Sequence, residues 1–372
     1  MKILLVARWP VGGIRTYFRY IYAQDLYANY ELVLLAPDIG LQDFLAEYFP
    51  VGRIRFIKAA NSDSALRREL NSILRSEKFD VIHSHGFSAG ALVSSLAQRL
   101  PAPHIMTAHD VFRADQFVGI KGKVKSLLLN LAYWRLDGVL TVGQDALENF
   151  KEFIPMVSPE KIHNIDHGVD AQRFASAEPR DFHKELDLQN RNIIGFFGRF
   201  MSQKGLLDVI KAMKILLERR TSEQMPIVLT FGWGGFIRED YALIDQLGLS
   251  DYFRQLPFTD DVPAAIKGVD LVVMPSRWEA CGLLAMEVLS AGTPLIASNC
   301  IGLRCVVKNT PALVIDPYRP DQLANAIEAE LTNSSAESFA AFQPLAVERF
   351  ALAKPARALH EYYQQLKENG CV

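Results

Sequence analysis

The sequence predicts an α/β protein in which helices cover both faces of doubly wound parallel sheets. Two observations lead to this fold class. Short runs rich in valine, leucine and isoleucine alternate with segments of helical spacing through most of the chain, as they do in such sheets. The chain also has 372 residues, a length that favours two domains over one.

Seven segments of the first half have the composition of buried strands. They are 2–7, 31–35, 53–58, 80–84, 105–108, 138–142 and 161–165. Helical spacing is expected at 14–28 and 65–77. In such sheets ligands bind beyond the carboxyl ends of the strands, so the loops that follow these segments are the first places to look for a site.

A tight glycine turn follows the first strand. It contains Gly12 and Gly13, but it lacks the GxGxxG spacing of a dinucleotide-binding fingerprint. The two glycines still allow the backbone to approach a phosphate or a sugar closely. A plain turn without a ligand is the alternative.

Three histidines lie at or just beyond the ends of expected strands in the first half. His83 and His85 are two residues apart and share a face of their strand, but no third ligand of suitable type can be placed, so no metal site is expected. His109 directly follows a buried strand and could form a hydrogen bond with a substrate hydroxyl. A buried structural histidine is the alternative for His109.

Composition limits the classes of function. The formal net charge is −2, so no nucleic-acid partner is expected. No apolar run reaches the about 18 residues that a bilayer span requires, and the N-terminal MKILLVARWP is interpreted as a first strand rather than a cleavable signal. The four cysteines show no CxxC spacing, which favours a reducing, cytoplasmic compartment.

The segment 121–134, KGKVKSLLLNLAYW, places three lysines before an apolar helix. Such a helix could attach to the surface of an anionic membrane. A helix that packs in the core and begins with solvated lysines is an equal alternative.

The second half begins after a polar segment at 176–191, which we interpret as a linker, with a new strand at 192–197. The loop GRFMSQKG follows that strand and leads into a helix at 206–220. Arg199 and Lys204 lie five residues apart on this loop, and such a pair can hold a phosphate group. Solvated surface cations are the alternative.

The segment 269–298 has the pattern strand, helix, strand, which implies a right-handed crossover in a parallel sheet. Glu279 lies before the helix and Glu287 lies inside it. Gly282 begins the helix, whose first amides could bind an anion while the carboxylates accept bonds from hydroxyls. Two glutamates without partners are the alternative. We interpret Cys281 as a packing residue.

Four parts of the chain together resemble the family 4 retaining glycosyltransferases of the GT-B fold, the group 1 glycosyl transferases. They are the Gly12-Gly13 turn, the loop 198–205, the segment SRWEACGLLAMEVLSAGTP and the DHGVD sequence at 166–170. The resemblance covers nearly the whole chain. It implies transfer of a sugar from a nucleotide-diphosphate donor such as a UDP or GDP sugar, with retained anomeric configuration and without a cofactor or metal.

The resemblance also implies roles for single residues. Arg199 and Lys204 would hold the donor diphosphate, with help from the amides around Gly282 and Leu283. Glu279 and His109 would contact the transferred sugar. The implied catalytic residues are Arg199, Lys204, Glu279 and His109. The implied donor-binding residues are Gly12, Gly13, Gly198, Phe258, Cys281, Gly282, Leu283, Leu284 and Glu287, with Glu287 on the ribose.

The implied architecture is two Rossmann-like domains that face each other across a cleft. The acceptor-side domain would span 1–175 and be joined by a C-terminal helix at 355–372, and the donor-binding domain would span 191–350. The chain departs from the family pattern at Cys281, often phenylalanine, and at His167, often asparagine. These departures leave the identity of the sugar open.

We expect a glycan or lipid-linked acceptor and a role in surface polysaccharide biosynthesis. The enzyme would be cytoplasmic, with possible peripheral contact with the inner face of the membrane through 121–134. Two alternatives share the fold. A nucleotide-sugar 2-epimerase would consume the donor without an acceptor, and a non-catalytic partner would have lost the charged residues that this chain retains.

Overall fold

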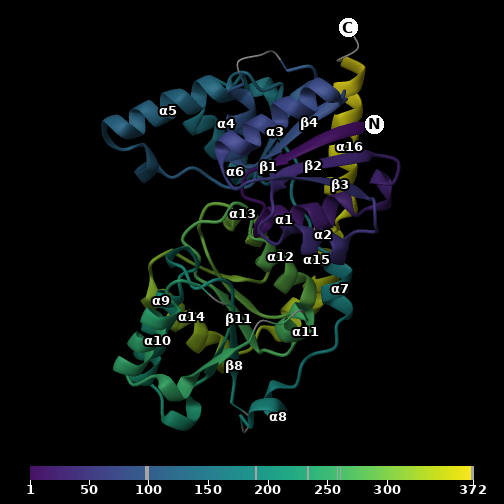
Figure 1. Ribbon diagram of the computed structural model, residues 1–372. Helices are drawn as coiled ribbons and strands as arrows, with labels where there is room; N and C mark the ends of the chain where they lie inside the picture. The colour runs from purple at the N-terminus through teal and green to yellow at the C-terminus, as the bar shows by residue number, and fades with distance from the viewer. Residues whose placement is uncertain (97–99, 189–190, 233, 258, 260, 370–372) are drawn as a thin grey trace. The chain divides into compact units, whose positions relative to one another are not determined.

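The chain folds into two compact units. The computed structural model describes residues 1–96, 100–188, 191–232, 234–257, 259 and 261–369. The first unit comprises residues 1–167 and 352–372, and the second comprises residues 168–351. Each unit contains a parallel sheet with helices packed around it (Figure 1).

The first unit contains a seven-stranded parallel sheet with the order β3-β2-β1-β4-β5-β6-β7. Its strands are β1 (Lys2–Ala7), β2 (Glu31–Pro37), β3 (Ile54–Ala59), β4 (Val81–His85), β5 (His104–Ala108), β6 (Gly138–Thr141) and β7 (Ile162–Asn164). All seven strands expected from the sequence are confirmed. The strand order reverses direction between β1 and β4, so the loops that follow these two strands lie side by side at the ligand-binding edge.

The helices of the first unit are α1 (Gly13–Tyr17), α2 (Leu41–Tyr48), α3 (Asp63–Ser76), α4 (Phe87–Ser94), α5 (Gly119–Tyr133), α6 (Gln144–Phe153) and α16 (Ala353–Asn369). The single regular helix expected at 14–28 is wrong. After α1 the chain forms a π-helical turn at Phe18–Tyr22 and a 3₁₀ turn at Asp25–Tyr27. The π turn directs Phe18, Tyr20, Ile21 and Tyr22 into the core together, which a 3.6-residue period would not do.

The C-terminal helix α16 packs into the core of the first unit. Leu359 and Tyr363 are completely buried in the same cluster as Ile3 and Leu5 of β1. The Tyr27 hydroxyl donates to the carbonyl of Ala356 at 2.8 Å. The opposite face of the sheet is covered by a separate cluster that includes Leu4 and Val6 together with residues of α3 and α4, as the alternation of side chains along a strand requires.

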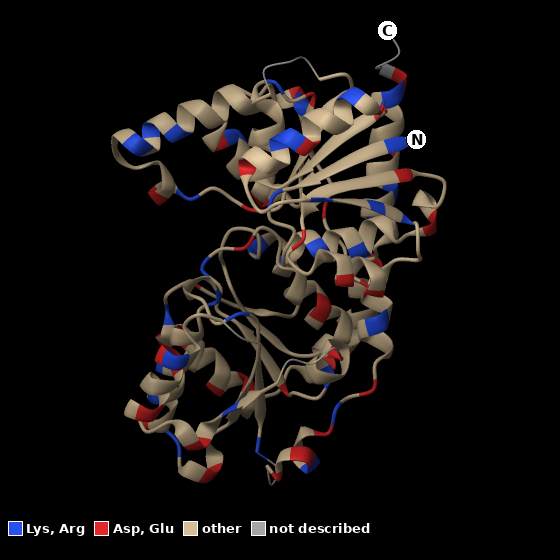
Figure 2. Cartoon of the chain, in the orientation of Figure 1, with Lys and Arg blue, Asp and Glu red and all other residues tan. Residues whose placement is uncertain are grey.

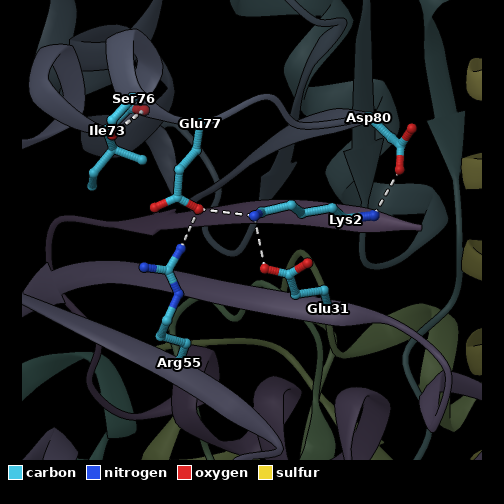
Figure 3. A network of polar contacts seen from close by, with 7 residues as sticks. All are labelled: Lys2, Glu31, Arg55, Ile73, Ser76, Glu77 and Asp80. Atoms are coloured by element: carbon cyan, nitrogen blue, oxygen red, sulfur yellow. Dashed lines mark hydrogen bonds and ion pairs between the residues drawn. The ribbon is translucent and has the colours of Figure 1, made fainter.

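Charged side chains connect three strands of the first unit at the edge opposite the expected site. Lys2 Nζ lies 2.7 Å from Glu31 and 2.8 Å from Glu77, and Glu77 also pairs with Arg55 (Figure 3). The backbone N–H of Lys2 donates to Asp80 at 2.7 Å. These pairs lie near the surface, so they fix register more than they add stability.

The second unit contains a six-stranded parallel sheet with the order β10-β9-β8-β11-β12-β13. Its strands are β8 (Ile193–Phe197), β9 (Ile227–Phe231), β10 (Phe253–Leu256), β11 (Leu271–Met274), β12 (Leu295–Ser298) and β13 (Leu313–Ile315). Its helices are α7 (Ala171–Ser176), α8 (Phe182–Leu186), α9 (Leu206–Leu217), α10 (Ile237–Gln246), α11 (Val262–Lys267), α12 (Leu283–Ala291), α13 (Arg304–Val307), α14 (Pro320–Thr332) and α15 (Ala336–Arg349). The central strands β8 and β11 are buried throughout.

The segment expected to be a linker is part of the second unit. Helix α8 forms inside 176–191, where the Asp181 side chain caps it and Phe182 is buried. Residues 168–175, which we expected at the end of the first domain, also belong to the second unit. Helix α7 packs there against α12 and α15, because Ala171 and Phe174 form its apolar face. The low periodicity of 176–191 therefore reflects a segment whose described residues contain one short helix, α8.

None of the helices within the described residues combines the length and the apolar character that crossing a bilayer requires.

Candidate functional site

The topology of the second unit brings the two charged loops of the sequence together. The strand order reverses between β8 and β11, which are hydrogen-bonded neighbours. The loop 198–205 follows β8 and the loop 275–282 follows β11. These loops therefore meet at the switch point of the sheet, where ligands of such folds bind.

An ion pair joins the two loops. Lys204 Nζ lies 2.7 Å from Glu279 Oε1, and the Ser276 hydroxyl donates to the same oxygen at 2.7 Å. Glu279 is 7% exposed, so its carboxylate depends on these partners to offset the loss of water. The side chain of Lys204 is 23% exposed and is the more accessible member of the pair.

Backbone contacts fix the spacing between the two loops. The N–H of Arg277 donates to the carbonyl of Gln203 at 2.8 Å, and the Gln203 amide donates back to the carbonyl of Trp278 at 2.9 Å. Gly205 has φ +77° and approaches Pro275 so closely that a Cβ atom would lie 2.1 Å from the Pro275 carbonyl oxygen. The loops are thus held at a distance that only glycine permits.

The loop after β12 supports Glu279 from the other side. The N–H of Glu279 donates to the carbonyl of Ile301 at 2.9 Å, and the N–H of Gly282 donates to the carbonyl of Gly302 at 2.9 Å. Gly302 has φ +75°, and a Cβ atom there would lie 2.0 Å from the Glu279 carbonyl oxygen. Three strand-end loops therefore determine where the Glu279 carboxylate lies.

Arg199 lies on the same loop as Lys204 but has a different environment. Its side chain is exposed, and within the part of the chain that the structure describes no ion pair or hydrogen bond engages it. Gly198 before it has φ +148°, and the space where its Cβ would lie is bordered by the Lys204 side chain, with Cγ at 3.6 Å. Arg199 is therefore available to a ligand, whereas Lys204 is already paired.

The start of α12 differs from the expected anion site. The N–H of Gly282 is occupied by Gly302, and the N–H of Leu283 donates to the carbonyl of Cys281 at 2.8 Å. These two amides, which we expected to contact an anion, are already satisfied by the protein. Leu284 and Glu287 are half-buried and lie on one face of the helix, three residues apart.

Two cysteines lie near this site. Cys281 is half-buried beside the helix start, and Cys300 is buried at the end of β12. Burial raises the pKa of the Cys300 thiol to about 11. A thiol with so high a pKa stays protonated at neutral pH and is a weak nucleophile.

A second charged pair lies beneath the loop and was not identified from the sequence. Arg277 Nη2 lies 3.8 Å from Asp208 Oδ2, and its guanidinium is 4.5 Å from the ring centroid of Tyr318. Burial raises the pKa of Asp208, although Arg277 and Lys211 oppose this shift. Asp208 is in the first turn of α9. An acidic residue at the start of an expected helix was the feature of the sequence that could have identified it.

His109 occupies the switch region of the first unit. It directly follows β5, and its Nε2 lies 3.0 Å from Nδ1 of His85 at the end of β4. The Tyr17 ring packs against it with a centroid distance of 4.9 Å. Burial, with a smaller contribution from His167, lowers the pKa of His109 to about 3. The imidazole is therefore neutral at physiological pH, and one of the two histidines donates to the other.

The other two histidines of this group have structural partners. His83 Nδ1 lies 2.5 Å from the Tyr363 hydroxyl, and its Nε2 lies 2.7 Å from the Thr107 hydroxyl. His85 Nε2 lies 3.1 Å from the Tyr22 hydroxyl. Both histidines are buried, and burial holds their pKa values well below 6.5. They link β4 to α16 through side-chain hydrogen bonds.

The glycine turn of the first unit is exposed. Gly12 has φ +54°, and Gly13 is the first residue of α1. A Cβ atom at either glycine would meet nothing within 4 Å among the described residues. The turn is thus open enough for a ligand to approach its backbone. Phe258, which we expected near the nucleotide, lies outside the described residues.

Two family models match the chain one after the other. The family described as "Glycosyltransferase Family 4" matches residues 11–173, and the family described as "Glycosyl transferases group 1" matches residues 178–342. The chain belongs to the family 4, group 1 glycosyltransferases. The resemblance stated from the sequence is thereby confirmed.

Curated relatives of this glycosyltransferase carry activities of the same class. This chain is 29% identical over 265 residues to "UDP-Gal:alpha-D-GlcNAc-diphosphoundecaprenol alpha-1,3-galactosyltransferase" of Escherichia coli. The aligned segment covers 69% of this chain and 68% of the E. coli protein. This chain is 25% identical over 313 residues to "D-inositol 3-phosphate glycosyltransferase" of Corynebacterium jeikeium, which covers 78% and 74% of the two chains.

Solved structures show the same fold. HepE of Anabaena, crystallised with UDP, matches with a TM-score of 0.82 at 20% identity and covers 98% of this chain and 100% of its own. Sucrose-phosphate synthase of Thermosynechococcus elongatus matches with a TM-score of 0.81 at 18% identity, covering 98% and 99%. The predicted GT-B fold of this glycosyltransferase, with two parallel-sheet α/β domains, is confirmed.

Proposed function

We propose that this glycosyltransferase transfers a sugar from a nucleotide-diphosphate sugar to a glycan or glycolipid acceptor with retention of configuration, in the biosynthesis of a surface polysaccharide. The observation that carries the proposal is the Lys204–Glu279 pair at the switch point of the second sheet, with the exposed Arg199 on the same loop. The E. coli relative, which is named for a UDP-galactose donor and a lipid diphosphate acceptor, supports a UDP donor and a lipid-linked acceptor.

In the proposed reaction, cations of the protein stabilise the departing diphosphate. An ammonium group has three donors, so the bond from Lys204 to Glu279 leaves two for phosphate oxygens. Arg199 adds a planar guanidinium that can grip two phosphate oxygens at once. These charges would replace a divalent metal in stabilising the leaving group.

The remaining residues would position the sugar and the nucleotide. Glu279 would accept hydrogen bonds from hydroxyls of the transferred sugar, and Glu287 would accept them from the ribose. His109 would contact a substrate hydroxyl as a neutral imidazole, because burial lowers its pKa to about 3. The donor would approach the backbone closely at Gly12, Gly13 and Gly198, and at Leu284 in the first turn of α12.

The proposed chemical step needs no protein nucleophile. The bond between the anomeric carbon and the diphosphate oxygen breaks, and an acceptor oxygen bonds to the same face of that carbon. The acceptor proton passes to the departing phosphate oxygen. This order of events retains the anomeric configuration through an oxocarbenium-like state and leaves sugar-acceptor product and nucleoside diphosphate.

A thermal-shift screen tests the donor assignment. A ligand that binds the native state raises Tm, and at a given concentration a tighter ligand raises it more. We expect UDP sugars, or failing these GDP sugars, to raise Tm, and we expect Arg199→Ala to abolish the shift. Arg238→Ala is the matched control, because it removes another exposed arginine of the same unit. Equal shifts in Arg199→Ala and wild type would contradict the diphosphate role of Arg199.

The nucleotide sugar identified by that screen then separates the alternatives. A transferase releases nucleoside diphosphate in quantity only when acceptor is added. We expect this release to continue when a chelator is present in excess. Conversion of the donor without acceptor would indicate a 2-epimerase. Complete loss of activity that metal restores would contradict metal-independent transfer.

A further inference from the structure

Helix α5 of the first unit presents an apolar face to solvent. This face, which we call the α5 apolar face, consists of Ile120, Val124, Leu127, Leu128, Leu131 and Trp134. Ile120 is 83% exposed, and Leu128 and Trp134 are each 60% exposed. The spacing of four, three, one, three and three residues places all six on one side of the helix. Helix α5 therefore carries apolar residues outward as well as inward, where Leu129, Ala132 and Tyr133 pack with the core.

Polar contacts on the opposite side hold the helix in this orientation. The Asn130 amide group donates to the carbonyl of Phe153 at 3.2 Å and accepts from the N–H of Met156 at 3.1 Å. The Tyr133 hydroxyl donates to the carbonyl of Phe87 at 2.9 Å. At Gly122, a Cβ atom would lie 2.2 Å from the backbone of Phe117. The helix cannot rotate its apolar face inward without breaking these contacts.

Positive charge borders the α5 apolar face. Lys121, Lys123 and Lys125 are exposed in the first turns, and no acidic residue occurs in α5 (Figure 2). At 3.6 residues per turn, Lys123 lies at one edge of the face and Lys121 lies at the other. Lys125 Nζ lies 5.1 Å from the ring centroid of Phe117. An apolar strip flanked by lysines at its start matches an anionic bilayer surface, where acyl chains lie beneath negatively charged headgroups.

We propose that the α5 apolar face docks this protein on the surface of a bilayer that contains anionic lipids. The apolar side chains would enter the region between headgroups and acyl chains, and the lysines would pair with lipid phosphates. Trp134 has the amphipathic ring that favours this interface. A second copy of the chain is a poorer partner, because a symmetric contact would pair α5 with itself, and α5 has no acidic residue to pair with the lysines. The inference does not rest on the proposed reaction.

Co-sedimentation of the full chain with lipid vesicles tests the proposal. We expect binding to vesicles of equal parts phosphatidylcholine and phosphatidylglycerol at low salt, and much weaker binding to phosphatidylcholine alone. Binding to the anionic vesicles should also decrease as salt is added, because the lysines are exposed and screened. No binding to anionic vesicles at low salt would overturn the proposal.

Paired variants separate the two components of the surface. Lys121→Gln/Lys123→Gln removes two charges and should weaken binding to anionic vesicles about twenty-five-fold, about five-fold for each lysine. Leu127→Gln/Leu131→Gln should abolish binding while leaving the fold intact, because both side chains are exposed. The matched controls are Lys151→Gln and Val51→Gln, which alter exposed residues of the same unit outside α5 and should bind as wild type.

Tryptophan fluorescence reports where the helix lies. The difference between wild type and Trp134→Phe isolates the emission of Trp134, which should shift to shorter wavelength when anionic vesicles are added. Analytical ultracentrifugation without vesicles tests whether a second copy of the chain binds the α5 apolar face. Concentration-dependent dimers that Leu127→Gln/Leu131→Gln dissolves would assign the α5 apolar face to a second copy and overturn the membrane assignment.

Discussion

At the scale of single residues, the pairing of Lys204 with Glu279 organises the candidate site. The buried Glu279 carboxylate lies 2.7 Å from the Lys204 ammonium group, which has further N–H donors for a ligand. Arg199, which is exposed nearby on the same loop, completes a positive surface without a carboxylate partner among the described residues. The site thus combines one fixed cation with one available cation.

Removal of the fixed cation should reduce turnover strongly. We expect Lys204→Ala to lower the rate about a hundred-fold or more, the scale of losing one charge-stabilising donor. It would also remove the Lys204 bond to the Glu279 carboxylate, which would keep the bond from the Ser276 hydroxyl. Release of nucleoside diphosphate in the presence of acceptor is the measurement. Lys211→Ala, which removes an exposed lysine of α9, is the control, and a near wild-type rate in Lys204→Ala would disprove its catalytic role.

At the scale of elements, three strand-end loops and one helix start form the support of Glu279. The loop after β12 contributes two backbone bonds and the close approach of Gly302. The sequence placed the glutamates and the glycine at the helix start, but it did not identify Gln203, Ser276 or Gly302 as supports. Each of these residues acts through contacts with residues distant in sequence, and periodicity carries no information on such contacts.

Gly302→Ala should disturb the site through this support. The left-handed backbone alone costs about 1–2 kcal/mol for a non-glycine residue, and the new Cβ would also clash with the Glu279 carbonyl oxygen, 2.0 Å away. Urea unfolding and donor-dependent turnover are the measurements, and both should fall. Gly248→Ala is the matched control, because Gly248 has φ +72° in the same unit with nothing within 4 Å of its Cβ position.

The Gly248→Ala control should lose stability through the cost of the left-handed backbone, but each folded molecule should keep its turnover. If Gly302→Ala and Gly248→Ala lose equal stability and both retain turnover, the approach of Gly302 to Glu279 has no functional role.

At the scale of the whole molecule, buried neutral histidines make the first unit sensitive to acid. His83, His85, His104 and His109 all have folded-state pKa values lowered by burial, to about 3 for His104 and His109. The same histidines titrate near 6.5 in the unfolded chain. Between these values the unfolded state binds more protons, so the free energy of unfolding rises with pH.

We therefore expect stability to be fully retained above pH 6.5 and to fall as the pH decreases below it. Each buried histidine contributes up to about 1.4 kcal/mol per pH unit in this window. Tm measured between pH 7.5 and 5, above the range where carboxylates titrate, is the test. His104→Asn should give a shallower slope, and His183→Gln, in the second unit, should not. A flat Tm between pH 6.5 and 5 would contradict the prediction.

The alternation of strands and helices, the charged loops and the family could all be predicted from the sequence. These features depend on local periodicity and on residue types at strand ends, which a linear chain records directly. The sequence also limited α5 to two alternatives without deciding between them.

Contacts between distant side chains could be established from the folded chain alone. Lys204 and Glu279 are 75 residues apart and come together because β8 and β11 are neighbours at the point where the sheet reverses. The amide of Gly282 proved to be occupied by the Gly302 carbonyl of a neighbouring loop, and that of Leu283 by the Cys281 carbonyl two residues before it. The apolar face of α5 proved to be exposed because Asn130 and Tyr133 bind the core instead. Strand order and helix rotation arise from packing between distant segments. The hydrophobic periodicity of a single segment does not predict that packing.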